Sequence, residues 1–315
     1  MTDDPSVQPE EIVPAENIPA QPSLTFVERY NIPPPLFALL ALFVVFIGYQ
    51  FIGAVVTYLL FGLEPTEENI QGFRVVTALS QLFLILVPTL FFGRLVSAKP
   101  RDFFRVKFPG FRALLLPIIG IVSLQQMLQV YMIFQSRIPL PQEIQTLVDQ
   151  LNELIERLTK MLAGSSSMPE LLWVIVVVAL IPAICEEFLF RGLAQRSFEK
   201  HTHPMIAAVV TGIIFASYHL NPFTFIPLAA LGIYLGFLAM RAQSLWVSVA
   251  AHFYNNLYAC VTIYLRMDDD IVGLGNPEKL SNGTLLLMFW FSGIVFLIST
   301  LYFMHITSVP AEKIR

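Results

Sequence analysis

The chain has 315 residues, of which 56% are hydrophobic and only 13% charged, and its mean hydropathy is +0.67. Soluble domains carry about 25% charged residues, so a soluble fold of this length has too few interior positions for so much apolar surface. The formal net charge of −4 offers no basic face for nucleic acid. The two cysteines lie in apolar runs, which favours buried thiols over a disulfide framework. The composition indicates an integral membrane protein.

The first 35 residues differ from the rest of the chain. They hold eight of the 22 prolines and six acidic residues, and the first basic side chain is Arg29. A secretory signal needs a basic start and an apolar core, and neither is present. Such a segment buries too little surface to offset the entropy of ordering it. We expect residues 1–35 to form a disordered, acidic, Pro-rich tail, and residues 36–315 to form the transmembrane domain.

Eight uncharged apolar runs then follow one another, each approaching or reaching the ~20 residues that span hydrocarbon. Backbone amides in lipid must be satisfied within their own segment, so these runs are expected to be helices. The runs are 36–63, 75–93, 113–136, 171–185, 205–220, 223–240, 244–265 and 284–306. The sequence predicts an all-α polytopic bundle of about eight transmembrane helices, in which the fifth and sixth are short enough to be re-entrant instead.

Lys and Arg residues set the expected orientation of these helices. If the N-terminus is cytoplasmic, the cytoplasmic segments hold thirteen of the 19 basic residues, six of them in the loop over residues 94–112. Cytoplasmic loops carry the excess of Lys and Arg. We therefore expect both termini to be cytoplasmic.

A different pattern lies between the third and fourth runs. Apolar residues recur every three or four positions from Ile144 to Leu162, and charged residues occupy the other face. This pattern predicts an amphipathic helix over residues 138–162 that lies at the non-cytoplasmic interface. A lid or a dimer contact is the alternative role.

The fourth run ends in the sequence Glu186-Glu187-Phe-Leu-Phe-Arg191. Ionisable side chains inside a membrane are costly and generally face a bundle interior or a cavity. Glu187 and Arg191 are spaced i, i+4 with the acid first, which is the favoured order for a helical ion pair. Glu186 is then left without a local partner, and an acid in an apolar site suits a general base. The alternative is that both acids are the wet end of a span.

Two histidines and an asparagine are expected at the same depth as Glu186. His219 ends the fifth run, and the seventh run carries His252 and, one turn later, Asn256. Folding the chain as a hairpin about Thr202 places Glu186 and His219 at one level, about 24–26 Å from the turn at 1.5 Å per residue. Each histidine alone is more often an interhelical hydrogen-bonding group, but the four residues together suggest a site.

The chemistry of this set is hydrolytic. A carboxylate and an imidazole can bind and deprotonate water, either directly or through a metal. Glu186, His219 and His252 are also a plausible zinc set that leaves a fourth position for water. The side-chain amide of Asn256 can donate to the oxyanion of a tetrahedral intermediate. The sequence leaves the metal-dependent and metal-free versions open.

The motifs EExxxR, FxxxH and HxxxN, in this order on successive apolar segments, resemble the CPBP family, which includes type II CaaX prenyl endopeptidases and bacterial Abi-like proteins. The resemblance covers about residues 170–260. It implies that Glu186 activates water with His219, that His252 and Asn256 stabilise the oxyanion or help hold a metal, and that Glu187 and Arg191 support the helix and cavity. It also implies a bacterial inner-membrane location.

The sequence therefore predicts an intramembrane metalloendopeptidase of the CaaX type that cleaves a membrane-tethered or lipidated peptide within the lipid bilayer. Two other functions stay open. One is a non-catalytic immunity or regulatory protein of the same family, for which an intact Glu/His/His/Asn set is not needed. The other is a proton-coupled transporter, which inverted repeats would favour, and we find no internal repeat.

Overall fold

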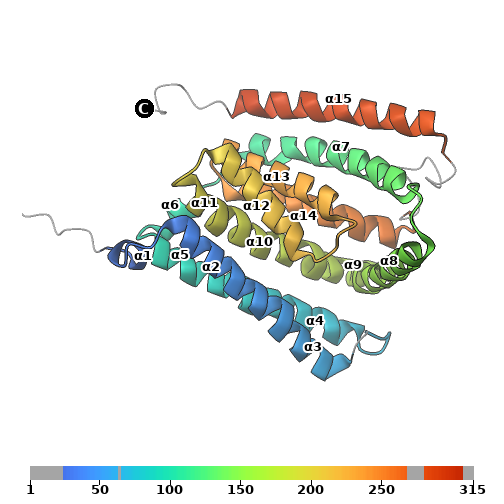
Figure 1. Cartoon of the computed structure of the whole chain (residues 1–315), viewed down its shortest axis with the longest axis horizontal. Helices are drawn as coiled ribbons and strands as arrows, with labels where there is room; N and C mark the ends of the chain where they lie inside the picture. Colours follow the sequence, from blue (N-terminus) through green and yellow to red (C-terminus); the bar gives the residue numbers. More distant parts are fainter. Residues whose placement is uncertain (1–23, 63–64, 268–279, 308–315) are drawn as a thin grey trace, which may run out of the picture.

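Residues 24–62, 65–267 and 280–307 are described in a computed structural model, and all regular structure within them is helical (Figure 1). Each of the eight apolar runs forms one helical rod. The first rod consists of α2 (Pro34–Ile47), the π-helical segment η2 (Gly48–Gly53) and α3 (Ala54–Phe61), and the second of α4 (Ile70–Gln81), η3 (Leu82–Leu86) and α5 (Val87–Val96). The third rod is α7 (Phe111–Ser136). The fourth consists of α9 (Met168–Val174), η4 (Ile175–Leu180), α10 (Ile181–Glu187), η5 (Phe188–Gln195) and α11 (Arg196–Glu199). The last four rods are α12 (Pro204–Tyr218), α13 (Phe225–Ala242), α14 (Leu245–Tyr264) and α15 (Asn282–Ile306).

The all-α membrane architecture expected from the sequence is confirmed. Among the described residues, six rods are long and apolar enough to cross a membrane, and α12 is a shorter apolar helix of 15 residues. The remaining rod, α14, carries the polar residues of the seventh run. The fourth rod is longer than predicted, because it continues beyond Cys185 as one helix to Glu199.

The rods are arranged in three layers (Figure 1). The hairpin of the first two rods lies on one side, the pair α7 and α15 lies on the other, and α9–α14 lie between them. Large apolar side chains such as Leu287, Trp290 and Phe291 on α15 are 66–73% exposed. Contiguous apolar surface of this kind on a helix that spans the bundle indicates contact with lipid. The middle layer is thus the part of the molecule most shielded from the bilayer.

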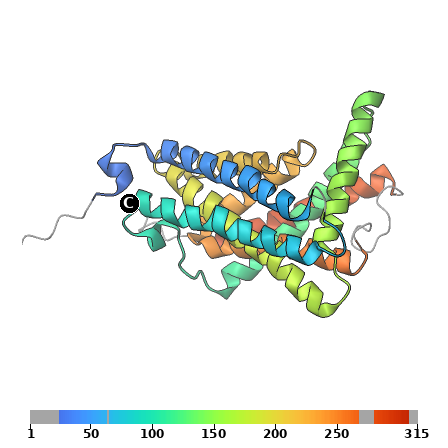
Figure 2. The ribbon, with the colours of Figure 1, turned by 90° about the horizontal axis from the view of Figure 1, so that it is seen from below.

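The amphipathic helix is α8 (Gln142–Ala163), which begins after Pro141. Figures 1 and 2 show α8 at one end of the bundle, running across the direction of the rods. Its last turn is held by Arg74 of α4, which donates to the carbonyl oxygens of Met161 and Leu162 at 3.0 and 2.9 Å. The structure thus forms the amphipathic helix expected over residues 138–162, beginning at Gln142, and its position at the non-cytoplasmic interface stays a prediction.

Residues 24–35, the described part of the expected N-terminal tail, are ordered. Residues 1–23 lie outside the described residues. Residues 26–29 form α1 (Phe26–Arg29), with a capping box between Thr25 and Glu28 and with Val27 buried against the core. Hydrogen bonds from Thr25 hold the pKa of Glu28 below its usual value. The expected disorder therefore does not extend over residues 24–35, because a cap and one buried side chain order them.

The basic loop after the second rod packs tightly on the fourth rod. This loop contains α6 (Pro100–Phe103) and the Phe104 ring, which fits against Gly192 so closely that an added Cβ there would lie 2.5 Å from the ring. Arg105 donates two hydrogen bonds to Glu199, at 3.2 and 2.7 Å. Burial lowers the pKa of the Arg105 guanidinium. The loop thereby fixes one end of the rod that carries the acidic pair.

Candidate active site

The acidic pair lies in the middle of a helix. Glu187 is the last residue of α10, and the same rod continues for three further turns through η5 and α11. Glu187 is 0% exposed, whereas the Glu186 side chain is 19% exposed. The alternative that both acids form the wet end of a span is therefore wrong for Glu187. The two π-helical segments η4 and η5 flank α10, and such segments occur frequently at functional sites.

Glu187 is the centre of a buried ionic cluster. Its Oε1 accepts a hydrogen bond from Arg191 Nη1 at 2.7 Å and another from His252 Nδ1 at 2.9 Å. Arg191 also donates from Nη2 to the carbonyl oxygen of Gly232 at 2.8 Å. The ion pair expected between Glu187 and Arg191 is thus present. Sequence reasoning missed the bond from His252 to Glu187, because these residues are 65 positions apart.

This cluster fixes the tautomer of His252. A carboxylate can only accept, so His252 Nδ1 carries a hydrogen, and when the ring is neutral Nε2 carries the lone pair. His252 is 3% exposed, and its Nε2 lies 3.9 Å from Glu186 Oε2. One water molecule can contact both atoms across that distance. The histidine that the structure places beside Glu186 is therefore His252.

His219 lies near His252, with the Phe215 ring in contact with both imidazoles. It follows the last residue of α12, and its Nδ1 donates to the carbonyl oxygen of Phe215 at 2.9 Å. The ring of Phe215 lies 4.8 Å from that of His219 and 5.9 Å from that of His252. Because a backbone carbonyl can only accept, His219 Nε2 also carries a lone pair when the ring is neutral. Among the described residues, no polar contact joins His219 to Glu186.

Asn256 lies one helical turn after His252 on α14, as expected from their i, i+4 spacing. Its Oδ1 accepts a hydrogen bond from Asn255 Nδ2 at 3.2 Å. The Asn256 amide therefore has a defined orientation, with its NH₂ group turned away from Asn255.

Glu186, His219 and His252 are the residues that would hold a metal ion. Two neutral imidazoles with free Nε2 atoms and a carboxylate are suitable zinc ligands by type. In the described part of the chain, however, no three His, Cys, Asp or Glu side chains are grouped closely enough to hold a metal ion, and this includes Glu186, His219 and His252. The arrangement of these side chains therefore does not fit a metal ion.

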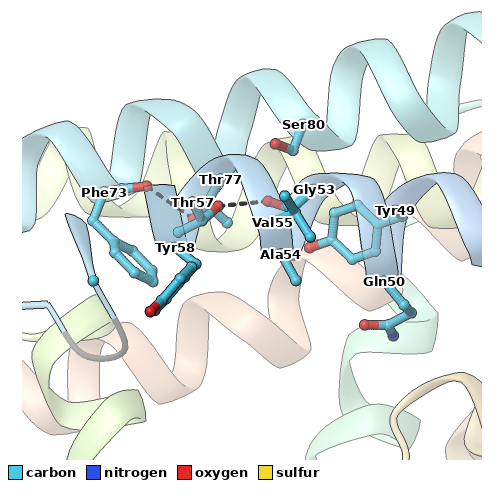
Figure 3. Close-up of a pocket in the computed structure, with 11 residues that line it drawn as sticks. Tyr49, Gln50, Gly53, Ala54, Val55, Thr57, Tyr58, Phe73, Thr77 and Ser80 are labelled. Carbon is cyan, nitrogen blue, oxygen red and sulfur yellow. Dashed lines mark hydrogen bonds between the residues drawn. The ribbon is translucent and has the colours of Figure 1, made fainter. Parts of the chain in front are cut away.

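A cavity of about 480 Å³ lies along the first hairpin (Figure 3). Its walls combine small residues with hydroxyl groups, and one end is formed by Tyr49 and Gln50. Gln50 Nε2 donates to the carbonyl oxygen of Tyr218, next to His219, at 2.7 Å. The other lining residues are Gly53, Ala54, Val55, Thr57, Tyr58, Gly62, Phe73, Thr77 and Ser80. The cavity thus adjoins the polar cluster without containing its motif residues.

Sequence reasoning also missed the polar side chains that the first three rods bring to the site. Gln50, Gln81 and Gln125 each lie within or at the edge of an apolar run. Gln81 is 7% exposed and donates to the Tyr49 hydroxyl at 3.4 Å. The signal that could have found them is the cost of an amide in lipid, which applies to glutamine as it does to glutamate.

The fold and the cluster define a polytopic helical membrane protein with a buried Glu/Arg/His network in its middle layer. Residues 168–258 match the family model described as type II CAAX prenyl endopeptidase Rce1-like. This stretch contains the acidic pair, both histidines and Asn256, so the resemblance inferred from the three motifs is confirmed. At the level of the family, the match supports a membrane protease. No curated protein and no solved structure matches the chain.

Proposed function

We propose that the protein is an intramembrane endopeptidase that hydrolyses a peptide bond of a membrane-tethered substrate, with Glu186 as the general base. The observation that carries the proposal is the orientation of His252 by Glu187, which turns Nε2 toward Glu186 at 3.9 Å. A base and a lone-pair acceptor at this spacing suit one water molecule held between them. The family match over the same residues supports this chemistry.

The proposed reaction begins with a water bound between Glu186 and His252. Glu186 removes one proton as the water oxygen attacks the peptide carbonyl carbon, and His252 Nε2 accepts the other water hydrogen as a hydrogen bond. The carbonyl becomes an oxyanion, to which the NH₂ group of Asn256 donates. The proton on Glu186 then moves to the amide nitrogen, the C–N bond breaks, and a carboxylic acid and an amine result.

The substrate proposed for this site has an apolar anchor in the bilayer and a peptide bond close to it, as a lipidated or prenylated C-terminal segment does. The cavity of about 480 Å³ along the first hairpin has exposed lining residues such as Val55 and Tyr58, and its lining residue Gln50 bonds the carbonyl oxygen of Tyr218, next to His219. We place the apolar anchor in this cavity. We further propose that both termini are cytoplasmic and that the membrane is a bacterial inner membrane.

The test is cleavage of lipidated and transmembrane peptides by the purified full-length protein in lipid nanodiscs. Glu186→Gln removes the proposed base, and His252→Gln replaces the proposed imidazole acceptor by a neutral amide that Glu187 cannot hold in the same orientation. We expect each to lower kcat by at least about 100-fold, which is the low end of what general acid–base catalysis contributes. A parallel arm with a chelator and then added zinc measures whether a metal takes part.

Matched controls are available on the same chain. Glu68 is an exposed acid before α4, and His201 is an exposed histidine in the turn between the fourth rod and α12. Glu68→Gln and His201→Gln should cleave as the unmodified protein does. Cleavage at an unchanged rate by both Glu186→Gln and His252→Gln would overturn the proposed function.

A further inference from the structure

The third rod contributes an amide that touches the site's asparagine pair. Gln125 lies in the middle of α7, outside the segment that matches the family model. Its Nε2 contacts two oxygens of Asn255, the backbone carbonyl at 3.3 Å and the side-chain Oδ1 at 3.0 Å. Asn255 Nδ2 in turn donates to Asn256 Oδ1 at 3.2 Å. Three amides from two helices thus form one hydrogen-bonded chain.

The direction of this chain is set at its first link. An amide side chain presents a donor group and an acceptor group, and either end can face a given partner. The backbone carbonyl of Asn255 can only accept, so the NH₂ group of Gln125 must face it. Asn255 Oδ1 lies beside the same donor, so the NH₂ group of Asn255 points the other way, toward Asn256 Oδ1. Asn256 is then left with its own NH₂ group available.

That orientation matters because the other candidate groups are acceptors. With their Nδ1 atoms donating to Glu187 and to the Phe215 carbonyl, neutral His252 and His219 have only lone pairs at Nε2. Glu186 is a carboxylate and accepts as well. Among these four side chains, Asn256 is therefore the one that offers a donor to an oxyanion while both imidazoles are neutral.

We propose that Gln125 is a positioning residue that acts through Asn255 to hold the Asn256 amide with its NH₂ group toward the substrate carbonyl. This inference rests on the proposed function for its consequence in cleavage, while the amide chain itself can be tested without any substrate. Gln125 lies on α7, outside the segment that matches the family model. The family motifs therefore do not include every residue of the amide chain.

The direct test is NMR of the full-length protein with ¹⁵N-labelled asparagine. Asn255→Ala and Asn256→Ala assign the two side-chain NH₂ signals. Gln125→Leu should shift the signals of both asparagines, because loss of the first donor frees Asn255 to rotate and so removes the bond to Asn256. Gln129→Leu, one turn along the same helix and without a hydrogen bond to either asparagine among the described residues, should shift neither. An unmoved Asn256 signal in Gln125→Leu would overturn the proposal.

Cleavage provides a second, independent measurement. Gln125→Leu should lower kcat about 10-fold with KM unchanged, which is less than the 10²–10³-fold cost of deleting an oxyanion donor outright. In an Asn256→Ala background, the same change should have no further effect. Additive losses would show that Gln125 acts only by supporting the fold. Gln125→Ser replaces Gln125→Leu in both experiments if the leucine variant does not fold.

The two proposals fail in different ways. If Glu186→Gln cleaves as fast as the unmodified protein, the proposed function falls, and the NMR signals still decide whether the amide chain exists. If Glu186→Gln is inactive and Gln125→Leu retains full activity, the proposed function stands and the positioning role is wrong.

Discussion

Arg74 and Arg191 are both 2% exposed, and each belongs to a helical rod of the bundle, but their surroundings differ. Arg74 donates from all three guanidinium nitrogens, to Glu170 and to three backbone carbonyls at the end of α8. Arg191 donates from Nη1 and Nη2, while its Nε is buried without a hydrogen-bond partner among the described residues. The acids differ in the same way. Glu170 accepts from Arg74, Gln71 and Ser166, whereas Glu187 Oε2 accepts no hydrogen bond within the described chain.

We call Arg74, Glu170 and the end of α8 the Arg74 clamp, and Glu187, Arg191 and His252 the Arg191 cluster. The difference in hydrogen bonding indicates that the clamp is structural and that the cluster belongs to the functional site. A buried ion pair is stable when further hydrogen bonds satisfy the remaining lone pairs and protons. The Arg74 clamp meets that condition and joins α4 to the end of α8. The Arg191 cluster meets it only in part, with the Phe215 ring 4.9 Å from the guanidinium as additional stabilisation. The Arg191 cluster orients His252. This orientation is kept although two buried atoms, Arg191 Nε and Glu187 Oε2, lack hydrogen-bond partners among the described residues.

The largest effect is expected from breaking the Arg191 cluster. Arg191→Leu leaves Glu187 buried with His252 as its remaining hydrogen-bond donor, and removal of one partner of a buried pair costs about 3–5 kcal/mol. The free energy of unfolding of the protein in detergent should fall by that amount, and cleavage should be lost.

A double variant distinguishes stability from orientation in this cluster. Glu187→Leu combined with Arg191→Met replaces the pair by apolar side chains, an exchange that is often neutral or stabilising. Most of the lost stability should therefore return. Cleavage should stay lost, since His252 Nδ1 has no carboxylate partner. Recovery of cleavage in the double variant would show that Glu187 does not orient His252.

A smaller effect is expected at the clamp. Arg74→Met removes the donors to the end of α8, but Glu170 keeps its bonds from Ser166 and Gln71 and stays partly solvated. We expect a loss of about 2 kcal/mol, as for hydrogen bonds to a charged group. Thermal unfolding measures the loss, and limited proteolysis should show faster cutting between α8 and α9. Catalysis at a temperature where the variant is folded should be unchanged, and a fall in kcat there would contradict the division into clamp and site.

A comparable or smaller effect is expected from packing beside Arg191. Gly192→Ala places a Cβ 2.5 Å from a ring carbon of Phe104, so that ring must shift. Overpacking of this kind costs about 1–3 kcal/mol. Gly53→Ala is the matched control, because its Cβ would lie 3.5 Å or more from its neighbours and make ordinary contacts. Equal unfolding temperatures for the two variants would show that Phe104 moves freely and does not brace the rod.

Much of the fold could be predicted from the sequence, because an apolar run in lipid must satisfy its own backbone amides and therefore forms a helix. The eight runs follow from continuous apolar stretches of about 20 residues. The amphipathic helix and the pairing of Glu187 with Arg191 follow from local patterns with a period of about 3.6 residues. The end of the fourth rod did not follow in this way. Its charged residues after Cys185 resemble a helix end in lipid, but Arg105 pairs with Glu199 and lets the helix continue within the protein.

The site followed from the sequence only in outline. Hairpin geometry placed Glu186 and His219 at one depth, but depth does not fix which residues touch. The contact of His252 with Glu187, and that of Gln125 with Asn255, depend on how helices rotate about their axes when they pack. The rotation of a helix can be predicted from the sequence when its apolar residues form a stripe on one side. These rods are apolar on most sides, so their sequence does not show which side faces a neighbouring helix.

The π-helical segments η4 and η5 lie on either side of α10, so the register of the fourth rod is sensitive to insertions and deletions. Each residue removed from a helix turns everything beyond it by about 100° and shifts it by about 1.5 Å. Deletion of one residue from the stretch Phe188–Phe190 would leave the acidic pair, Arg191 and Gly192 present, yet it would turn Gly192 away from Phe104 or Glu186 away from His252. In this rod the number of residues is a stricter requirement than the identity of most of them.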